Sequence, residues 1–316
     1  MTTPVEELEL HTKREIGHAV HGLDAVIHGL LIACVARGHV LIQGVPGLGK
    51  TLLAKSLALC LGGSFQRIQG TSDLMPSDIV GVHVFDPREQ KFVFHPGPVF
   101  ADVLLVDEIN RAGPKTQSAL LEAMEERQVT VERERFALRD RFMVLATQNP
   151  QDFEGTFPLP ESQLDRFMLR LDMRYPSAET EAAIVGHYGS SLGAPRIETF
   201  GIAPVDTALV AAAREQAAQV HVSDSLVDYL LRIAAATRQN PSIALGLSTR
   251  AVLALTWAAR IEAAARGGEF VTPDDVKAIA PAVMAHRLVL SPDAALDNLT
   301  ADSLVERVLG QVEVPR

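Results

Sequence analysis

The sequence predicts an α/β fold in which a parallel sheet covered by helices is followed by an all-helical domain. Between about residues 39 and 173, short apolar runs alternate with helical patterns, and strands that alternate with helices form parallel sheets covered on both faces. From about 204 to 309 the chain is rich in Ala and Leu at helical spacing and shows no convincing strand. Ser223, Ser248 and Thr272 are expected to be N-caps of three helices there, and the TPDD that begins at Thr272 resembles a capping box.

Short apolar runs supply the expected buried strands of the sheet. In chain order they are HVLIQG (39–44), SFQRIQG (64–70), DVLLVDE (102–108), FMVLATQNP (142–150) and RFMLRLDM (166–173). Helical segments such as KTLLAKSLALCL and KTQSALLEAMEE lie between them, as a parallel sheet requires.

The composition limits the possible classes of protein. A chain of 316 residues can hold about two domains. Its formal charge of −10, with acids and bases interspersed and no basic run, repels free nucleic acid and anionic lipid. Cys34 and Cys60 lie in apolar segments and are expected to be buried thiols. The longest uncharged apolar stretch, 25–36, is too short to span a bilayer, and the acidic start does not resemble a signal peptide. We therefore expect a cytoplasmic protein without membrane insertion.

The segment GVPGLGKT at residues 44–51 predicts a phosphate-binding loop. It follows a predicted strand and opens a predicted helix, so its amides and the helix N-terminus can face phosphates. Lys50 would reach the β- and γ-phosphates of a nucleoside triphosphate, and Thr51 would ligate Mg²⁺. The expected ATP-binding residues here are Gly44, Pro46, Gly47, Leu48, Gly49, Lys50, Thr51 and Leu52.

The segment LLVDEINRA at residues 104–112 predicts the catalytic acids. Four apolar residues end in Asp107 and Glu108, which places both carboxylates at the tip of a buried strand beside the phosphate loop. Asp107 would hold Mg²⁺ through water, and Glu108 would orient and deprotonate the attacking water. No acceptor pocket with a basic lid, Asn-Lys-x-Asp guanine reader or transporter LSGGQ motif is present. These patterns indicate that the triphosphate is hydrolysed.

Nearly the whole chain resembles the MoxR family of AAA+ ATPases, within the helix-2-insert clade that includes the magnesium chelatase ATPase subunits. The resemblance lies in motifs that follow one another in the family's order: GHVLIQGVPGLGKT, GPVFADVLLVDEINRA, LLEAMEERQVTV, ATQNPQDFEGTFPLPESQLDRF and GLSTRA. It implies a P-loop NTPase sheet of strand order 5-1-4-3-2, a helical lid and a homo-oligomeric ring, usually hexameric. It also implies a chaperone-like role on a protein client with a partner that carries a von Willebrand factor A domain. The chain has no Asp-x-Ser-x-Ser motif of its own, so that partner would be a separate protein.

The resemblance also sets the expected domain organisation. Residues 1–185 would form the AAA+ domain, with a helix-2 insert hairpin at 78–100 and a second hairpin at 129–138 before sensor 1. Residues 186–203, rich in Gly, Ser and Pro, would be a linker, and 204–316 the lid.

Two residues of the AAA+ domain match the family's catalytic pattern. Asn149 ends a predicted strand and matches sensor 1, which holds the lytic water or the γ-phosphate, although an Asn before Pro is also ordinary turn chemistry. Arg166, in SQLDRF, matches the arginine finger that stabilises charge on the γ-phosphate. The alternative for Arg166 is a surface ion pair with Asp165 or Asp172.

Three further positions have roles by resemblance. Arg250, two residues after the Ser248 cap, matches sensor 2 of the lid, and it can act in its own subunit or in the next. Arg111, after DEIN, is a second interface arginine or a structural partner for Glu122 or Glu125. Gly22, in AVHGLDAV (19–26), is expected to contact adenine through its backbone.

The favoured function is ATP-driven remodelling of protein partners, with ATP and Mg²⁺ as cofactors. One alternative is a nucleotide-gated scaffold with slow turnover. A less favoured alternative is a nucleic-acid motor, because glutamates alternate with arginines in the 129–138 hairpin and disfavour phosphate tracking. In the 78–100 hairpin, apolar residues such as Val82, Val84, Phe92 and Phe94 either bury against the domain or stay available to a partner, while the turn 86–90 is expected to be exposed.

Overall fold

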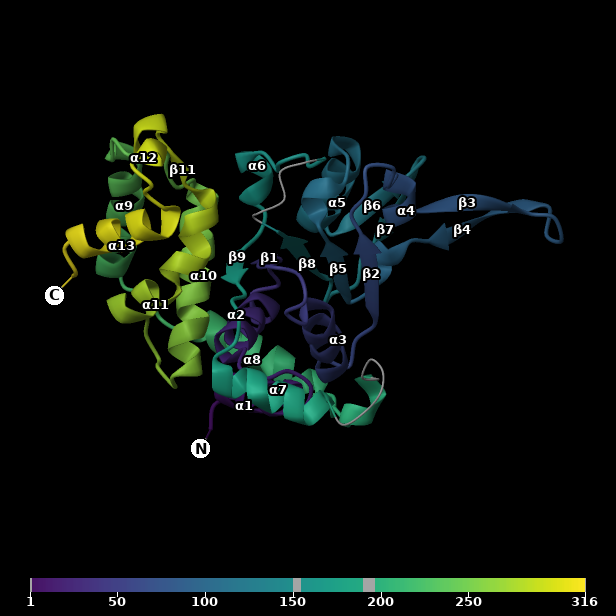
Figure 1. Cartoon of the computed structure of the whole chain (residues 1–316), viewed down its shortest axis with the longest axis horizontal. Helices are drawn as coiled ribbons and strands as arrows, with labels where there is room; N and C mark the ends of the chain where they lie inside the picture. The colour runs from purple at the N-terminus through teal and green to yellow at the C-terminus, as the bar shows by residue number, and fades with distance from the viewer. Residues whose placement is uncertain (1, 150–154, 190–196, 316) are drawn as a thin grey trace.

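A computed structural model describes residues 2–149, 155–189 and 197–315, and its main sheet is parallel (Figure 1). The strand order is β2-β5-β8-β1-β9. Counted along the chain these are the second, third, fourth, first and fifth sheet strands, so the expected order 5-1-4-3-2 is confirmed. The strands are β1 (Val40–Gln43), β2 (Phe65–Gln69), β5 (Val103–Asp107), β8 (Met143–Gln148) and β9 (Leu169–Asp172).

Alternate residues of the central strands face opposite sides of the sheet, and each side has its own core. Leu105 and Leu145 join a large cluster that contains the helices α1 (Pro4–Gly17), α2 (Asp24–Val35) and α3 (Lys50–Cys60). Leu104 and Val144 join a second cluster with α4 (Pro76–Val80) and α5 (Pro114–Glu126). A strand buried on both faces must be apolar throughout, which is why the runs at β5 and β8 show no polar alternation.

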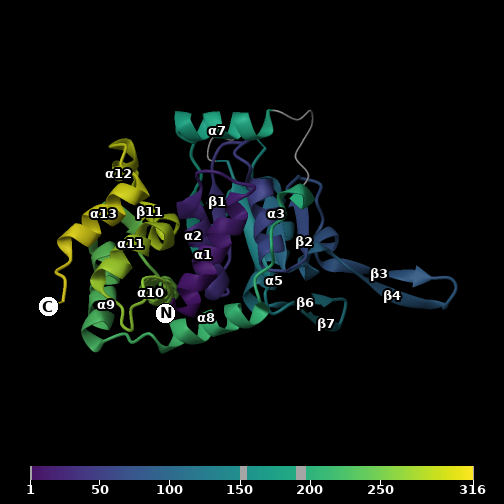
Figure 2. The same ribbon diagram turned by 90° about the horizontal axis from the view of Figure 1, so that it is seen from below.

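Two antiparallel hairpins project from the sheet domain, and the longer one extends as an arm (Figures 1 and 2). The arm consists of β3 (Gly81–Asp86) and β4 (Lys91–Pro96), and the shorter hairpin of β6 (Gln128–Val131) and β7 (Glu134–Ala137). The two meet at their bases, where Phe94 stacks on Phe136 with ring centroids 4.1 Å apart.

The apolar residues of the arm differ in burial. Val82, Val84 and Phe92 are 41%, 45% and 69% exposed, whereas Phe94 is partly buried against the core. The interpretation that this face buries against the domain is therefore correct for Phe94 and wrong for the other three. Among the described residues, the outer part of the arm has little domain surface to pack on, and Phe92 instead contacts the ring of Phe85 across the hairpin, with ring centroids 5.5 Å apart.

The C-terminal part of the chain is mainly helical. Ser223, Ser248 and Thr272 accept hydrogen bonds from the first turns of three of its helices, which confirms them as N-caps, and Thr272 forms the expected capping box with Asp275. The absence of strands was a wrong expectation, because β10 and β11 pair antiparallel. The elements are α9 (Asp224–Gln239), β10 (Ile243–Leu245), α10 (Thr249–Ala265), α11 (Pro273–Met284), β11 (Val289–Leu290), α12 (Pro292–Leu296) and α13 (Ala301–Gln311).

The connection between the two parts contains more regular structure than its composition indicates. Helix α7 (Ala178–Tyr188) runs into the segment 186–203, which was expected to be a linker, and the 3₁₀ turn η3 (Ile197–Phe200) follows. Helix α8 (Thr207–Gln219) then packs on α1 (Figure 2). The first helix of the chain and the first helix of the C-terminal part therefore pack against each other.

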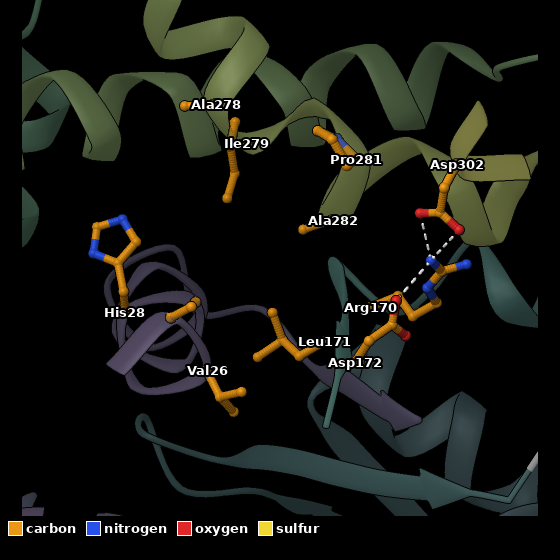
Figure 3. A pocket seen from close by; sticks show the side chains of 12 residues that line it. Val26, His28, Arg170, Leu171, Asp172, Ala278, Ile279, Pro281, Ala282 and Asp302 are labelled. Carbon is orange, nitrogen blue, oxygen red and sulfur yellow. Dashed lines mark hydrogen bonds and ion pairs between the residues drawn. The ribbon is translucent and has the colours of Figure 1, made fainter. Parts of the chain in front are cut away.

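Ion pairs connect the helical part to the sheet domain (Figure 3). Arg170 of β9 donates to both carboxylate oxygens of Asp302 on α13, at 2.6 and 2.7 Å. His28 of α2 lies between two carboxylates, with Nδ1 2.8 Å from Glu9 of α1 and Nε2 2.7 Å from Glu262 of α10. These contacts fix α10 and α13 against α1, α2 and the edge strand of the sheet.

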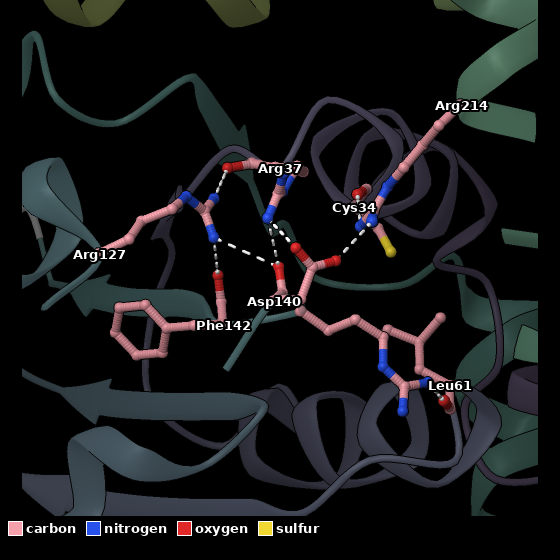
Figure 4. Close-up of polar contacts among 8 residues, drawn as sticks. Cys34, Arg37, Leu61, Arg127, Asp140, Phe142 and Arg214 are labelled. Carbon is pink, nitrogen blue, oxygen red and sulfur yellow. Dashed lines mark hydrogen bonds and ion pairs between the residues drawn. The ribbon is translucent and has the colours of Figure 1, made fainter. Parts of the chain in front are cut away.

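An arginine network lies near the starts of strands β1 and β8 (Figure 4). Asp140 pairs with Arg37 and, at 3.2 Å, with Arg214 of α8. Arg127, which ends α5 in the left-handed region, donates to the carbonyl groups of Arg37 and Phe142. All of these arginines have partners within the fold, so the network is structural.

Cys34 and Cys60 are free and buried, as expected. Within the described ranges, no helix is long and apolar enough to cross a membrane.

Candidate active site

The phosphate loop is built by glycines that adopt backbone angles other residues avoid. Gly47 and Gly49 have φ of 85° and 79°, in the left-handed region that favours glycine. Gly49 caps α3, so the helix begins at Lys50 with the loop at its N-terminal end. The loop joins β1 to α3 and therefore places the positive end of the helix dipole at the carboxyl edge of the sheet.

A cleft of about 390 Å³ lies over this loop. Most of the predicted ATP-binding residues line it, together with residues from the ends of β2, β5 and β8: Pro46, Gly47, Gly49, Lys50, Thr51, Leu52, Arg67, Gln69, Asp107, Glu108, Thr147 and Asn149. Gly44 and Leu48 do not line the cleft. The Gly44 carbonyl accepts a hydrogen bond from Lys50 Nζ, and Leu48 packs against the core.

The two acids occupy the expected place at the end of β5. Thr147 of β8 connects them, because its hydroxyl donates to Asp107 Oδ1 at 3.2 Å and accepts the backbone N–H of Glu108 at 2.9 Å. Glu108 has φ 54° and ψ 52°, a left-handed conformation that is costly for a residue with a side chain. This conformation turns the Glu108 carboxylate into the cleft while Asp107 stays nearly buried.

Sequence reasoning missed Arg67 and Gln69, which contact these acids directly. Arg67 Nε lies 2.6 Å from Asp107 Oδ2, and Gln69 Nε2 donates to Glu108 Oε2 at 2.9 Å. Both residues stand on β2, two positions apart and hence on one face of the strand. The signal was the polar pattern of FQRIQ in a run that was treated as a buried strand.

Lys50 shares the cleft with the acids. Burial lowers the pKa of the Lys50 ammonium group, and the negative charges of Asp107 and Glu108 oppose that shift. The cleft therefore combines a partly desolvated cation with two carboxylates, the charge pattern that a metal-bound polyphosphate requires.

Arg166 and Arg250 do not line this cleft and meet elsewhere. Both form ion pairs with Glu125 on α5. The alternative partners considered for Arg166, Asp165 and Asp172, are therefore wrong. Asp165 instead pairs with Arg287 at 2.7 Å.

Arg111 also has a different partner from those considered. Its guanidinium lies 3.3 Å from Glu108 Oε2, so the pairing with Glu122 or Glu125 is wrong. Arg111 does not line the phosphate cleft itself but contacts Glu108, which does.

Gly22 lies in the turn between α1 and α2 with φ 72°, and it does not line the phosphate cleft. A Cβ at this position would come 2.7 Å from Thr180 Cγ2 on α7, so the glycine allows close packing of that helix.

Tyr175, which is exposed, lines a neighbouring hollow together with Gly44 and Val45. Sequence reasoning did not select Tyr175.

Comparison with known proteins identifies the class. Residues 39–169 match the ATPase family associated with various cellular activities (AAA), and residues 235–308 match the AAA lid domain. A crystal structure of a Cytophaga hutchinsonii protein assigned as an ATPase superposes with a TM-score of 0.89 at 34% identity, covering 99% of this chain and 97% of that one. The fold and the cleft are those of an AAA+ ATPase, and the enzyme hydrolyses ATP.

Sequence relatives define the family within this class. The chain is 41% identical to the uncharacterized protein YeaC of Bacillus subtilis, over 95% of both chains. It is 39% identical to the chaperone MoxR1 of Mycobacterium tuberculosis, over 98% of this chain and 84% of that one. The chain belongs to the MoxR family of chaperone-like AAA+ ATPases.

Proposed function

We propose that this ATPase hydrolyses Mg-ATP within a homo-oligomeric ring and uses the energy to remodel a protein client together with a separate von Willebrand factor A domain protein. The single observation that supports assembly into a ring is that the predicted catalytic residues lie in two separate places. Lys50, Asp107 and Glu108 line one cleft, while Arg166 and Arg250 lie on Glu125 outside it. A second copy can supply those arginines to the cleft.

The residues of the cleft fit Mg-ATP. Lys50 and the loop amides can bind the phosphates, and Thr51 and Asp107 can hold the metal ion. Bound Mg²⁺ supplies charge neutralisation at the γ-phosphate. Asn149 and Glu108 directly follow the neighbouring strands β8 and β5, and they can hold and deprotonate the attacking water. Gly47 and Gly49 have open space where a side chain would lie, so the loop can wrap closely around the phosphates.

Among the described residues, the cations at the cleft other than Lys50 are already paired. Arg67 lines the cleft and pairs with Asp107, and Arg111 beside it pairs with Glu108. Growing charge on the transferred phosphoryl group favours an additional arginine, as in related phosphoryl-transfer enzymes. Arg166 and Arg250 of the next protomer fit this role, and their shared position supports action of both in trans.

The arm formed by β3 and β4 is the proposed contact with the client or partner. Its outer side chains, including Val84, Phe85 and Phe92, are exposed, and exposed apolar groups on one projecting element mark interaction sites. Its turn is compact, since Asp86 accepts the backbone N–H of Arg88 at 2.8 Å. The arm emerges next to α4, which packs on α5 and the catalytic half of the sheet.

Two variants test turnover. Glu108→Gln should retain ATP binding and lose hydrolysis, because the base is absent while the phosphate-binding residues remain. Lys50→Ala should lose ATP binding itself. Hydrolysis by Glu108→Gln at the wild-type rate would show that Glu108 is not the general base. Slow ATP turnover by the wild-type enzyme would favour the alternative function, a nucleotide-gated scaffold.

A shortened arm tests remodelling. Replacing 87–90 by a tight two-residue turn should leave basal ATPase near the wild-type rate, because the arm lies outside the cleft. The same change should abolish stimulation by the partner or remodelling of the client. Normal remodelling by the shortened protein would show that the arm is only structural. Addition of DNA should not stimulate the ATPase, and stimulation would favour the nucleic-acid motor.

A further inference from the structure

Glu125 holds two arginines that come from different parts of the molecule. Arg166, which follows the short helix α6 (Glu161–Leu164), lies with Nη2 2.9 Å from Glu125 Oε2. Arg250, in the first turn of α10, pairs through Nη2 with the other oxygen, Oε1. One carboxylate of α5 therefore connects the sheet domain and the helical part through both of its oxygens.

A second carboxylate fixes the same two segments. Asp165 accepts a hydrogen bond from Ser248, the N-cap of α10, at 2.9 Å. It also pairs at 2.7 Å with Arg287, a nearly fully buried residue that donates to the carbonyl group of Phe167 at 2.7 Å. The chain neighbour of Arg166 is thus attached to the helix that carries Arg250. The two arginines cannot separate without breaking both connections.

Each guanidinium retains donors for another anion. Arginine has five N–H groups, and each of these two arginines contacts Glu125 through Nη2. Arg166 Nε is buried and has no hydrogen-bond partner among the described residues, so its pairing is incomplete. A buried donor without a partner is unfavourable unless a ligand or neighbouring chain satisfies it.

The surroundings favour an anion. A hollow of about 480 Å³ beside the pair is lined by five arginines and only two carboxylates; its charged lining residues are Arg37, Arg127, Arg166, Arg250, Arg287, Glu125 and Asp165. Arg37 is neutralised by Asp140, and Arg287 by Asp165. The three other arginines of the lining still outnumber Glu125, so the hollow is locally positive on a chain whose formal charge is −10. Polyphosphate at the cleft of a second copy has the complementary charge.

We infer that Glu125 is a positioning residue that presents Arg166 and Arg250 as one unit to the ATP of a neighbouring copy. This inference rests on the proposed function, in which both arginines act in trans. Two long arginine side chains lose rotamer freedom when they bind phosphate. Because Glu125 fixes both before the neighbour arrives, that cost is reduced and their spacing is set.

The first test compares Glu125→Gln with Glu126→Gln. Both changes remove one carboxylate from adjacent positions of α5, and Glu126 is exposed. Glu125→Gln should lower kcat about tenfold to a hundredfold, the range expected when reacting groups are misplaced by about 1 Å. Its affinity for ATP, measured with a fluorescent nucleotide, should be unchanged because the cleft is intact. Glu126→Gln should match the wild type in both measurements.

The second test asks in which copy Glu125 acts. When Glu125→Gln is mixed with an equal amount of Lys50→Ala, about a quarter of the sites in a randomly mixed ring combine an intact cleft with intact neighbouring arginines. ATPase activity should therefore rise well above that of either variant alone. A variant that had merely lost its fold would not be rescued, and neither would one whose Glu125 acted in its own cleft.

The outcomes separate this inference from the proposed function. If Arg166→Ala keeps full activity, the proposed trans site fails. If Arg166→Ala is inactive but Glu125→Gln keeps wild-type kcat, or exceeds it because Glu125 competes with phosphate, only the positioning role of Glu125 is refuted. In a background that already carries Arg166→Ala and Arg250→Ala, Glu125→Gln should cause no further loss, since Glu125 acts through those two arginines.

Discussion

Protonation of His28 should control how firmly α10 is held against the N-terminal helices. The hydrogen bonds to Glu262 and Glu9 raise the pKa of His28 from 6.5 to about 9, and the hydrogen bond from His28 lowers the pKa of Glu9 from 4.5 to about 2. The contact therefore favours the protonated, charged form of His28 and the ionised form of Glu9. Lys13, 2.6 Å from Glu9, adds a further positive charge.

The sign of the effect differs for the two groups. A raised histidine pKa means that the stabilisation is complete below about pH 6.5 and is lost as the pH rises through about 9. A lowered glutamate pKa means that the stabilisation is present above about pH 4.5 and is lost as the pH falls through about 2. The contact should thus contribute most between about pH 4.5 and 6.5.

The magnitude follows from the size of the histidine shift. At about 1.4 kcal/mol for each pKa unit, the change from 6.5 to about 9 corresponds to roughly 3 kcal/mol. The side chains of His28 and Glu262 are each 23% exposed, and solvent screening reduces the figure to about 1–2 kcal/mol. Most of this should be measurable as a pH-dependent difference between His28→Gln and the wild type, because glutamine can accept and donate hydrogen bonds but carries no charge.

The assay is urea unfolding of both proteins at pH 6 and pH 10. We expect His28→Gln to lower the free energy of unfolding by about 1–2 kcal/mol more at pH 6 than at pH 10. His221→Gln, which removes an exposed histidine, is the control and should show no such difference. A destabilisation by His28→Gln of equal size at both pH values would refute the charged contact.

Two further substitutions test the geometry of the phosphate cleft. Gly70→Ala would place a Cβ 2.2 Å from the Glu108 carbonyl oxygen, so we expect about a hundredfold lower kcat with ATP binding retained. Gly113→Ala, in which the new Cβ would have its nearest neighbour at 3.8 Å, is the matched control. Normal turnover by Gly70→Ala would contradict the required position of Glu108. Arg67→Gln removes the cation beside Asp107, so it should lower the free energy of unfolding without Mg²⁺ by about 1 kcal/mol and less when Mg²⁺ and ATP are present. Equal stability of Arg67→Gln and wild type in metal-free urea unfolding would show that the pair is not stabilising.

Local patterns were sufficient for most of the fold. The alternation of apolar runs with helical patterns predicted all strands of the main sheet, and side-chain chemistry at Ser223, Ser248 and Thr272 predicted three helix starts. The pair β10 and β11 escaped because strands of three and two residues have no recognisable period. Their pairing depends on the packing of α10 and α11, which a local pattern does not contain.

The cleft was predictable to the extent that its residues are adjacent in sequence. The segment 44–51 and the pair Asp107 and Glu108 each carry their own pattern, whereas Arg67 and Gln69 reach the acids only because β2 lies beside β5. Apolar alternation predicted the hairpin at 78–100, but it could not tell which of its side chains would be supported by a neighbour such as Phe136.

The partner of Arg166 shows the same limit. Several acids lie near it in sequence, and Glu125 is distant, so proximity along the chain favoured Asp165 and Asp172. The fold decided otherwise, because α5 and the segment after α6 meet at the side of the sheet where α10 begins.

The most direct test of a site shared between copies is complementation of two inactive proteins. Lys50→Ala cannot bind ATP but retains Arg166, and Arg166→Ala retains the cleft but lacks the arginine. After mixing in equal amounts, with co-assembly demonstrated by copurification of differently tagged chains, about a quarter of the sites in a random ring should be complete. The account predicts recovered ATPase activity of that order. Absence of recovery in demonstrably mixed assemblies would contradict it.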